Sequence, residues 1–213
     1  MFQLEPHLPK NTGRGGRWKE HRKIINGILF RIRTGIPWRD LPRRFGSWQT
    51  CYDRHRRWST DGTWERIVRA VQADADADGR IDWSMVSVDS TMIPVLDRLR
   101  VPRLDGGRPR TRPDHLSGDK AYSSRRNRRY LRRRQIKHTI PERRDQRAHR
   151  LRRGSSGGRP TGFDAARYVR RNEVERLINR LKANRAVATR FDKRAYVFYG
   201  TVTVAALRLW LCA

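Results

Sequence analysis

Apolar and polar positions alternate at helical spacing through the first third of the chain. In residues 18–33 the isoleucines and leucines recur three or four positions apart, and Gly35 follows where a left-handed helix C-cap belongs. Further helical signals occupy residues 37–41, which begin with proline, residues 48–58, and about residues 64–72. The pattern predicts a run of short helices separated by proline and glycine.

The helix predicted at residues 48–58, with Ser47 as its N-cap candidate, is amphipathic. At 100° per residue, one face carries Trp48, Cys51, Tyr52, His55 and Trp58. The opposite face carries Gln49, Thr50, Asp53, Arg54, Arg56 and Arg57. The apolar position of His55 predicts a core histidine rather than a metal ligand.

This arrangement of helices is typical of a helix-turn-helix DNA-binding region, in which one helix lays its outer residues in the major groove. The residues expected to contact DNA are Gln49, Thr50, Arg54 and Arg57. The alternative is an ordinary helical bundle with a solvated, charged face.

An acidic segment, residues 74–84, follows the predicted helices. It begins like a calcium-binding EF-hand loop, but Met85 stands at the twelfth position, where a bidentate glutamate is required. We therefore interpret this segment as an acidic linker that follows a helical region of residues 1–73.

Beyond the linker, short stretches rich in β-branched residues alternate with helical patterns. Residues 85–92, 115–118 and 135–140 predict strands, and residues 123–134 and 165–184 predict helices. Residues 142–160 predict a basic, glycine-rich loop. The apolar residues 195–213 are interrupted by Arg208, which favours a buried terminal helix over a membrane span. The predicted fold class is α/β, with the sheet in residues 85–213.

Three acids stand apart from their basic surroundings. Asp89 and Asp119 lie near the ends of two predicted strands, and a glutamate lies on the late helix. Helical geometry selects Glu175 over Glu173. The face of Glu175 also carries Tyr168, Arg171 and Lys182. The adjacent arc, expected to dock the helix on the sheet, carries Val174, Leu177, Ile178 and Leu181.

Such a set of acids suits phosphodiester chemistry. Two strand-borne aspartates and a helix glutamate can hold two divalent ions about 3.5–4 Å apart. Oxygen ligands favour Mg²⁺, with Mn²⁺ as the second choice. Arg171 and Lys182 can clamp phosphates beside the ions. The alternative is that the acids are scattered salt-bridge partners.

The composition predicts a polyanionic partner. The chain has 213 residues, a formal net charge of +29 and only 36% apolar residues, and this balance favours double-stranded DNA, with structured RNA as an alternative. Most of the basic residues are arginine, which suits phosphate contacts or reflects a coding bias. Two cysteines and no basic-then-apolar leader predict a cytoplasmic protein without a membrane partner.

Several motifs together point to a known family. The residues Tyr168, Arg171, Glu175 and Lys182 have the spacing of a Tyr-Arg-Glu-Lys signature. Two acidic motifs are Asp89-Ser90-Thr91 and Asp119-Lys120-Ala121-Tyr122-Ser123. Two N-terminal motifs are Gly35-Ile36-Pro37-Trp38-Arg39-Asp40-Leu41-Pro42 and Phe45-Gly46-Ser47-Trp48-Gln49-Thr50. In these motifs the chain resembles bacterial insertion-sequence transposases of the DDE class, insertion-sequence-five type.

The resemblance implies a ribonuclease-H-like catalytic core over residues 85–213. Asp89, Asp119 and Glu175 would be its catalytic residues and the ligands of two Mg²⁺ ions. Tyr168, Arg171 and Lys182 would contact DNA. The implied activity is cleavage at terminal inverted repeats followed by transfer of the freed 3′-hydroxyl into target DNA, with a homodimer during synapsis.

The interval between Asp89 and Asp119 departs from this family. The family fold requires two further strands and a helix there, or about 30–45 residues by average element and loop lengths. The interval is shorter and leaves room for only a turn or two of helix around residues 95–100. We expect an internal deletion that removes the outer strands, keeps Asp89 and Asp119 adjacent, and impairs transposition. The alternative function is a non-catalytic DNA-binding remnant that occupies the ends of an insertion element.

Overall fold

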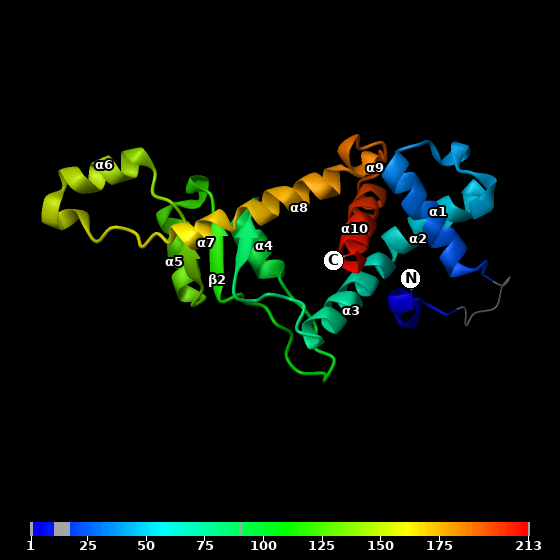
Figure 1. Cartoon of the computed structure of the whole chain (residues 1–213), viewed down its shortest axis with the longest axis horizontal. Coiled ribbons are helices and arrows are strands. Elements are labelled where there is room, and N and C mark those ends of the chain that lie inside the picture. Colours follow the sequence, from blue (N-terminus) through cyan, green and yellow to red (C-terminus); the bar gives the residue numbers. More distant parts are fainter. Residues whose placement is uncertain (1, 11–17, 90, 213) are drawn as a thin grey trace. The chain divides into compact units, whose positions relative to one another are not determined.

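The computed structural model describes residues 2–10, 18–89 and 91–212, and the chain divides into two compact units. The first unit combines Met1–Ala75 with Ile178–Ala213, and the second is Asp76–Leu177. Figure 1 shows the chain coloured from its N-terminus to its C-terminus, with the elements of both units labelled. The second unit is thus inserted between two segments that together build the first.

This division corrects the one expected from the sequence. The first boundary follows Ala75, inside the predicted linker of residues 74–84. That segment begins as helix, because α3 (Thr63–Ala77) continues into it and buries Ala75. The predicted domain of residues 85–213 is not one unit, because the residues from Ile178 onward group with the N-terminal helices.

The described part of the first unit is helical. Its elements are η1 (Phe2–His7), α1 (His21–Thr34), η2 (Trp38–Asp40), η3 (Arg43–Phe45), α2 (Trp48–Thr60), α3, α9 (Arg185–Ala188) and α10 (Ala195–Leu211). Gly35 ends α1 in the left-handed conformation (φ 69°), as predicted, and its N–H donates to the Arg31 carbonyl at 2.8 Å. The predicted cap at Ser47 is wrong in detail, because its hydroxyl donates to the Gln49 side chain instead of accepting a backbone N–H.

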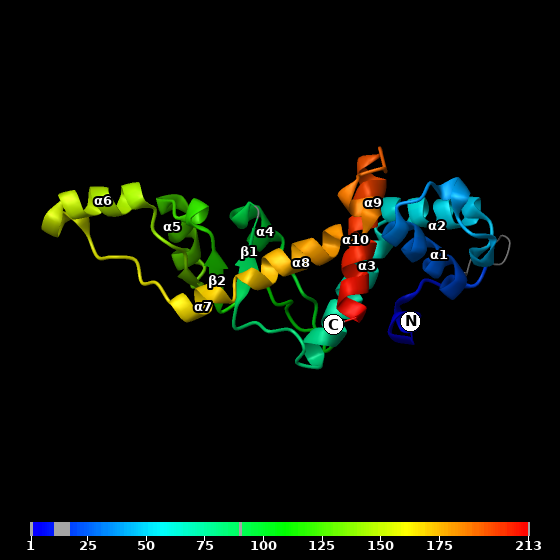
Figure 2. The same cartoon turned by 45° about the horizontal axis from the view of Figure 1, so that its top comes forward.

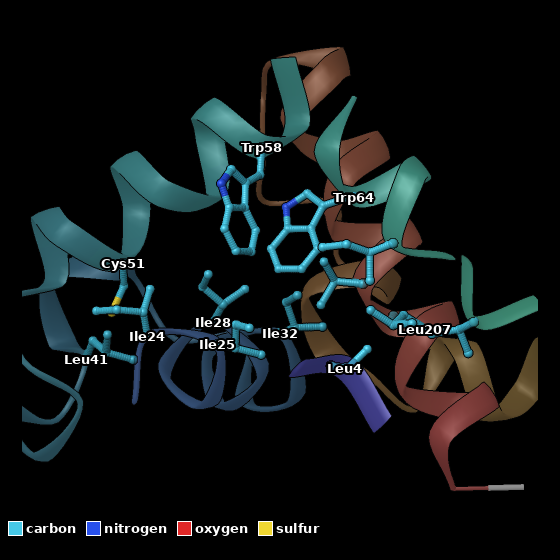
Figure 3. Close-up of a cluster of buried hydrophobic side chains, with 14 residues drawn as sticks. Leu4, Ile24, Ile25, Ile28, Ile32, Leu41, Cys51, Trp58, Trp64 and Leu207 are labelled. Carbon is cyan, nitrogen blue, oxygen red and sulfur yellow. The ribbon is translucent and has the colours of Figure 1, made fainter. Parts of the chain in front are cut away.

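The core of the first unit forms where α1 faces α2 and α3. Four isoleucines of α1, at helical spacing, are buried: Ile24, Ile25, Ile28 and Ile32. Figure 3 shows Trp58 and Trp64 pointing toward these side chains from α2 and α3, and their rings meet edge to face with centroids 4.8 Å apart. Because burying a side chain of this size contributes about 1.5–3 kcal/mol, this cluster supplies much of the stability of the unit.

The apolar C-terminal segment forms α10, as predicted, and packs against α2. Gly200 lies where α10 meets α2, and a Cβ atom at this position would overlap the side chain of Ser59. His55 of α2 is fully buried, as predicted, and bonds Thr201 of α10 at 3.1 Å. None of the helices in the described part of the chain has both the length and the apolar character needed to cross a membrane.

The second unit carries the sheet. Its elements are β1 (Val86–Val88), α4 (Met92–Arg98), β2 (His115–Gly118), η4 (Lys120–Tyr122), α5 (Arg125–Arg133), β3 (Lys137–Thr139), α6 (Arg144–Arg152), η5 (Gly154–Gly157) and α7 (Ala165–Val169). The helix α8 (Asn172–Lys182) begins in this unit and ends in the first. The strands are parallel and lie in the order β1-β2-β3, with Val86 opposite Leu116 and Leu116 opposite His138.

Alternate residues of β2 point to opposite faces of the sheet. Leu116 belongs to the core cluster formed with α4 and α5, which also includes Val88, Met92, Leu96, Tyr130, Leu131, Ile136 and Ile140. His115 and Ser117 alternate with Leu116, and Figure 2 shows α7 beside β2, which it contacts. Burial lowers the pKa of His115, and the nearby charge of Arg167 in α7 lowers it further.

Several sequence-based expectations for the second unit need correction. The predicted loop of residues 142–160 contains α6, and the predicted helix of residues 165–184 is divided into α7 and α8. The short helix expected at residues 95–100 is α4, which starts earlier because Pro94 is tolerated in its first turn. Between β1 and β2, the described residues hold α4 and one isolated bridge, Val101 with Arg110, rather than further strands. The fold is mostly helical with a small parallel sheet, so the α/β class is correct at that level.

Candidate functional site

Two aspartates lie at the same edge of the sheet. β1 ends at Val88 and β2 ends at Gly118, and these two residues are partners in the parallel register. Asp89 and Asp119 are the next residues along the two strands, so the pairing brings them to neighbouring positions at the carboxyl ends. The backbone agrees with the expectation that Asp89 and Asp119 stay adjacent.

Tyr122 connects these two acids electrostatically. Asp119 is the N-cap of η4, and its Oδ1 accepts the N–H of Ala121 at 3.2 Å. This short turn places Tyr122 back beside the strand ends. The pKa of Tyr122 is raised, first by burial and then by the negative charges of Asp89 and Asp119. Both carboxylates therefore act on one phenol, in keeping with the strand pairing that places Asp89 and Asp119 at one edge of the sheet.

The segment that carries Tyr168, Arg171 and Glu175 is not one continuous helix. At the break between α7 and α8, backbone bonds span three residues, from the Arg171 N–H to the Tyr168 carbonyl and from the Glu173 N–H to the Arg170 carbonyl. The break nevertheless keeps the predicted residues together. The Arg171 guanidinium lies 5.5 Å from the centre of the Tyr168 ring.

Arg171 forms an ion pair with Glu175. Its Nη2 donates to Glu175 Oε1 at 2.7 Å, with the Arg171 side chain 13% exposed and the Glu175 side chain 50% exposed. Burial alone would lower the pKa of Arg171, but Tyr168, Glu175 and Asp119 raise it above its usual value. The guanidinium of Arg171 thus neutralises the carboxylate of Glu175, which the sequence analysis expected to bind a metal ion.

The expected pair of Mg²⁺ ions does not fit this arrangement of side chains. Carboxylate oxygens are suitable donors, and Asp89 and Asp119 share one edge of the sheet. Glu175, however, is held by Arg171. Among the residues that the structure describes, no three His, Cys, Asp or Glu side chains are grouped so that they could hold a metal ion.

The apolar arc of α8 does not dock on the sheet as expected. Val174, Ile178 and Leu181 are only partly buried and Leu177 is exposed. Lys182, the last residue of α8, is exposed and lies about two turns beyond Glu175 on the same helix.

Most of the predicted outer face of α2 is accessible to solvent. Gln49 and Arg57 are exposed and Thr50 is partly buried, as a face directed to solvent requires. Among the described residues, no acidic side chain pairs with Arg57, and the Gln49 side-chain oxygen accepts the hydroxyl of Ser47. Contact of this face with DNA stays a prediction.

Arg54 is the exception, and its predicted place on the outer face is wrong. Its side chain lies over the rings of Trp18 (4.3 Å) and Trp58 (5.3 Å), and the residue is 7% exposed. Its Nη1 donates to His21 Nδ1 at 3.0 Å. Stacking on aromatic faces offsets the desolvation of a guanidinium, so Arg54 braces the helices instead of facing DNA.

A buried polar network in the first unit escaped the sequence analysis. Arg31 Nη1 donates to Asp192 Oδ2 at 2.8 Å, and the Thr201 hydroxyl donates to the same oxygen at 2.8 Å. Because the Thr201 hydrogen is used in this way, its oxygen accepts from His55 Nε2. Arg31 and Asp192 are 161 positions apart, and no pattern along the chain signals their pairing.

Comparisons with known proteins agree with the N-terminal motifs. Residues 2–68 match the family described as "Putative transposase of IS4/5 family (DUF4096)". The chain is 39% identical over 93 residues to the "Insertion element IS402 uncharacterized 16.2 kDa protein" of Burkholderia cepacia, a match that covers 42% of this chain and 63% of that protein. It is 30% identical over 92 residues to the "Uncharacterized protein y4sN" of Sinorhizobium fredii, covering 43% of this chain and 69% of that protein. No solved structure matches the chain.

The family match covers helices that precede the sheet. They include α1, η2 and α2, which carry the exposed polar face and the Gly35 cap. The acids of the second unit lie outside the family match of residues 2–68. Through its N-terminal region, the chain therefore belongs to the IS4/5 family of transposase-related proteins.

Proposed function

We propose that the chain binds double-stranded DNA at the terminal inverted repeats of an insertion element and occupies those ends without cutting them. The observation that carries this proposal is the exposed polar face of α2, with Gln49 and Arg57, inside the region that matches the transposase family. A helix of this kind reads base edges in the major groove while neighbouring cations hold the phosphates.

The charge of the chain supports a DNA partner. A formal net charge of +29 makes a polyanion the natural ligand, since bound phosphates relieve the self-repulsion of the protein. The arginines provide planar donors for phosphate oxygens. Occupancy of DNA ends requires these features and no further chemistry.

The arrangement of Asp89, Asp119 and Glu175 favours binding of DNA ends over their cleavage. Glu175 is neutralised by Arg171, so the three acids expected to work together are not free at the same time. The described interval between β1 and β2 also lacks the outer strands that flank the first aspartate in the family that the chain resembles. A ribonuclease-H-like ancestry, reduced to three parallel strands, accounts for both features.

One observation favours a second candidate, DNA cleavage and strand transfer. Asp89 and Asp119 follow paired strand residues, and their charges act on the same Tyr122. This geometry preserves two of the three acids of a DDE site. Release of Glu175 from Arg171 would be required before the third could join them.

A binding assay tests the first candidate. Labelled duplexes with the terminal repeat and with a shuffled sequence of equal composition are titrated with the full chain. We expect tighter binding to the repeat, and Arg57→Gln is expected to weaken it about tenfold. Arg69→Gln is the matched control, because it removes the same charge from an exposed position of α3. Equal affinity for both duplexes would contradict recognition of the repeats.

A strand-transfer assay decides between the candidates. The full chain is incubated with Mg²⁺, a pre-cleaved end of the repeat and a target plasmid, in parallel with Asp89→Asn. We expect binding without joined products. Joined products that depend on Mg²⁺ and disappear in Asp89→Asn would establish the second candidate instead.

A further inference from the structure

A cavity of about 570 Å³ opens in the first unit, beside the segment that follows α1. Its wall comes from η2, from α2 and from the residues that lead into α10. This size falls within the range of about 300–1,000 Å³ that is usual for small-molecule and cofactor sites. Neither the exposed face of α2 nor the acids of the second unit line the cavity.

Aromatic rings dominate this wall. They belong to Trp38, Trp48, Tyr52 and Phe191. The Trp38 and Tyr52 rings meet at a centroid distance of 5.6 Å, whereas Phe191 is 59% exposed. An exposed phenylalanine beside other rings offers a flat apolar face on which a planar group can stack.

Three cations surround the aromatic wall. Arg39, Lys193 and Arg194 line the cavity and are exposed, and the described residues give none of them an acidic partner. Arg39 lies 5.9 Å from the centre of the Trp48 ring, and Arg194 donates to the Tyr196 hydroxyl at 3.1 Å. Their positive charge attracts an anionic group to the opening of the cavity.

A carboxylate lies deeper. Asp192 lines the cavity but is only 9% exposed, and its Oδ2 accepts from Arg31 and Thr201. The charges are thus arranged with exposed cations outside and a buried acid inside. A ligand with an anionic outer part and a flat, neutral inner part matches this arrangement.

We propose that this cavity takes up one unstacked nucleotide of bound DNA, with its base on the aromatic wall and its phosphate at Arg39, Lys193 and Arg194. The proposal rests on the proposed DNA-binding function and adds a site for a base that has left the duplex. Stacking on aromatic side chains accepts any base, so the site selects an unpaired position rather than a sequence. Such positions occur where a DNA end frays or a strand is distorted.

The test uses closed DNA dumbbells, which have no free ends, in two forms. One is fully paired, and the other carries a single bulged 2-aminopurine, whose fluorescence falls when it stacks on an aromatic ring. The full-length protein is expected to bind the bulged form about fivefold or more tightly and to quench its fluorescence. Phe191→Ala is expected to abolish both effects, and Phe191→Tyr to retain them.

Tyr199→Ala is the matched control, because Tyr199 is an aromatic residue of the same unit with 57% exposure and lies outside the cavity. It should leave the preference for the bulged form unchanged. Normal binding to the paired dumbbell with no preference for the bulge, or a preference that Phe191→Ala leaves intact, would overturn the cavity proposal alone. Absence of binding to either dumbbell would overturn the proposed DNA-binding function together with it.

Discussion

Arg54 and Arg57 show how three positions on a helix decide the role of an arginine. Arg57 faces solvent, whereas Arg54 lies over Trp18 and Trp58 and donates to His21. Burial lowers the pKa of Arg54, yet the ring faces and the imidazole keep the guanidinium in place. A residue type that suggests DNA contact in the sequence is thus structural at one position and available to ligand at the other.

The substitution Arg54→Ala is expected to lower the free energy of unfolding by about 2 kcal/mol, because it removes a desolvated cation–π contact and the packing of the side-chain stem. Arg57→Ala is expected to change it by less than about 0.5 kcal/mol. Urea unfolding of the two variants measures the difference. Equal effects would show that Arg54 does not brace the helices.

His55 makes stability depend on pH. Burial and the charge of Arg31 lower its pKa to about 4, against the opposing effect of Asp192. The unfolded chain binds the proton near pH 6.5, so the stability present above that pH is lost as the pH falls toward 4. We expect the free energy of unfolding to fall by about 2 kcal/mol between pH 7 and pH 5 because of His55. Urea titrations of the wild type and His55→Gln check this, since the variant should lack that part of the decrease.

At the scale of helices and strands, packing against a neighbouring element outweighs the intrinsic preference of single residues. In α10, Gly200 is a poor helix former but lets the helix approach Ser59 of α2. In α8, the apolar arc predicts a docked helix, but its side chains are partly buried or exposed. Periodicity therefore identifies which face is apolar, while the neighbouring element decides whether that face is buried.

The substitution Gly200→Ala tests this order of effects. Helix propensity alone predicts a gain of about 1 kcal/mol. The overlap with Ser59 predicts a net loss of about 1–3 kcal/mol instead. Thermal unfolding measures the sign, and adding Ser59→Gly should recover part of the loss. A stabilised single variant would show that α2 and α10 can separate without penalty.

At the scale of the whole molecule, the relevant features are the net charge and the division of the chain into two units. The first unit holds the region that matches the transposase family, and the second holds the sheet and the acids. The formal net charge of +29 belongs to the chain as a whole. Association with DNA is therefore expected to depend strongly on ionic strength.

If the chain neutralises six to ten phosphates, its affinity for duplex DNA should fall about 10³- to 10⁵-fold between 50 and 200 mM salt. Fluorescence anisotropy over this range gives the slope. Arg57→Gln is expected to reduce the slope by about one if Arg57 contacts a phosphate, and to leave it unchanged if Arg57 contacts a base. An affinity that is insensitive to salt would contradict the electrostatic basis of binding.

The sequence allows prediction of local features better than of the connections between distant segments. The Gly35 cap, β2 and the N-terminal helices follow from spacing and turn chemistry, and they occur as predicted. Other features depend on contacts between segments far apart in the chain. These are the burial of Arg54, the Arg31–Asp192 pair and the packing of α10 in the first unit. For the candidate site, the strand ends predicted that Asp89 and Asp119 lie close together. They did not predict the ion pair between Arg171 and Glu175.

The ion pair between Arg171 and Glu175 also shows how the negative charge of the acids is balanced in the folded state. Arg171 provides the positive charge for Glu175, and a backbone N–H does part of the same for Asp119. The chain thus carries its own counter-charge at this position, built from side chain and main chain. Chelation should therefore leave the fold unaffected, and melting temperatures in EDTA and in millimolar magnesium are expected to coincide.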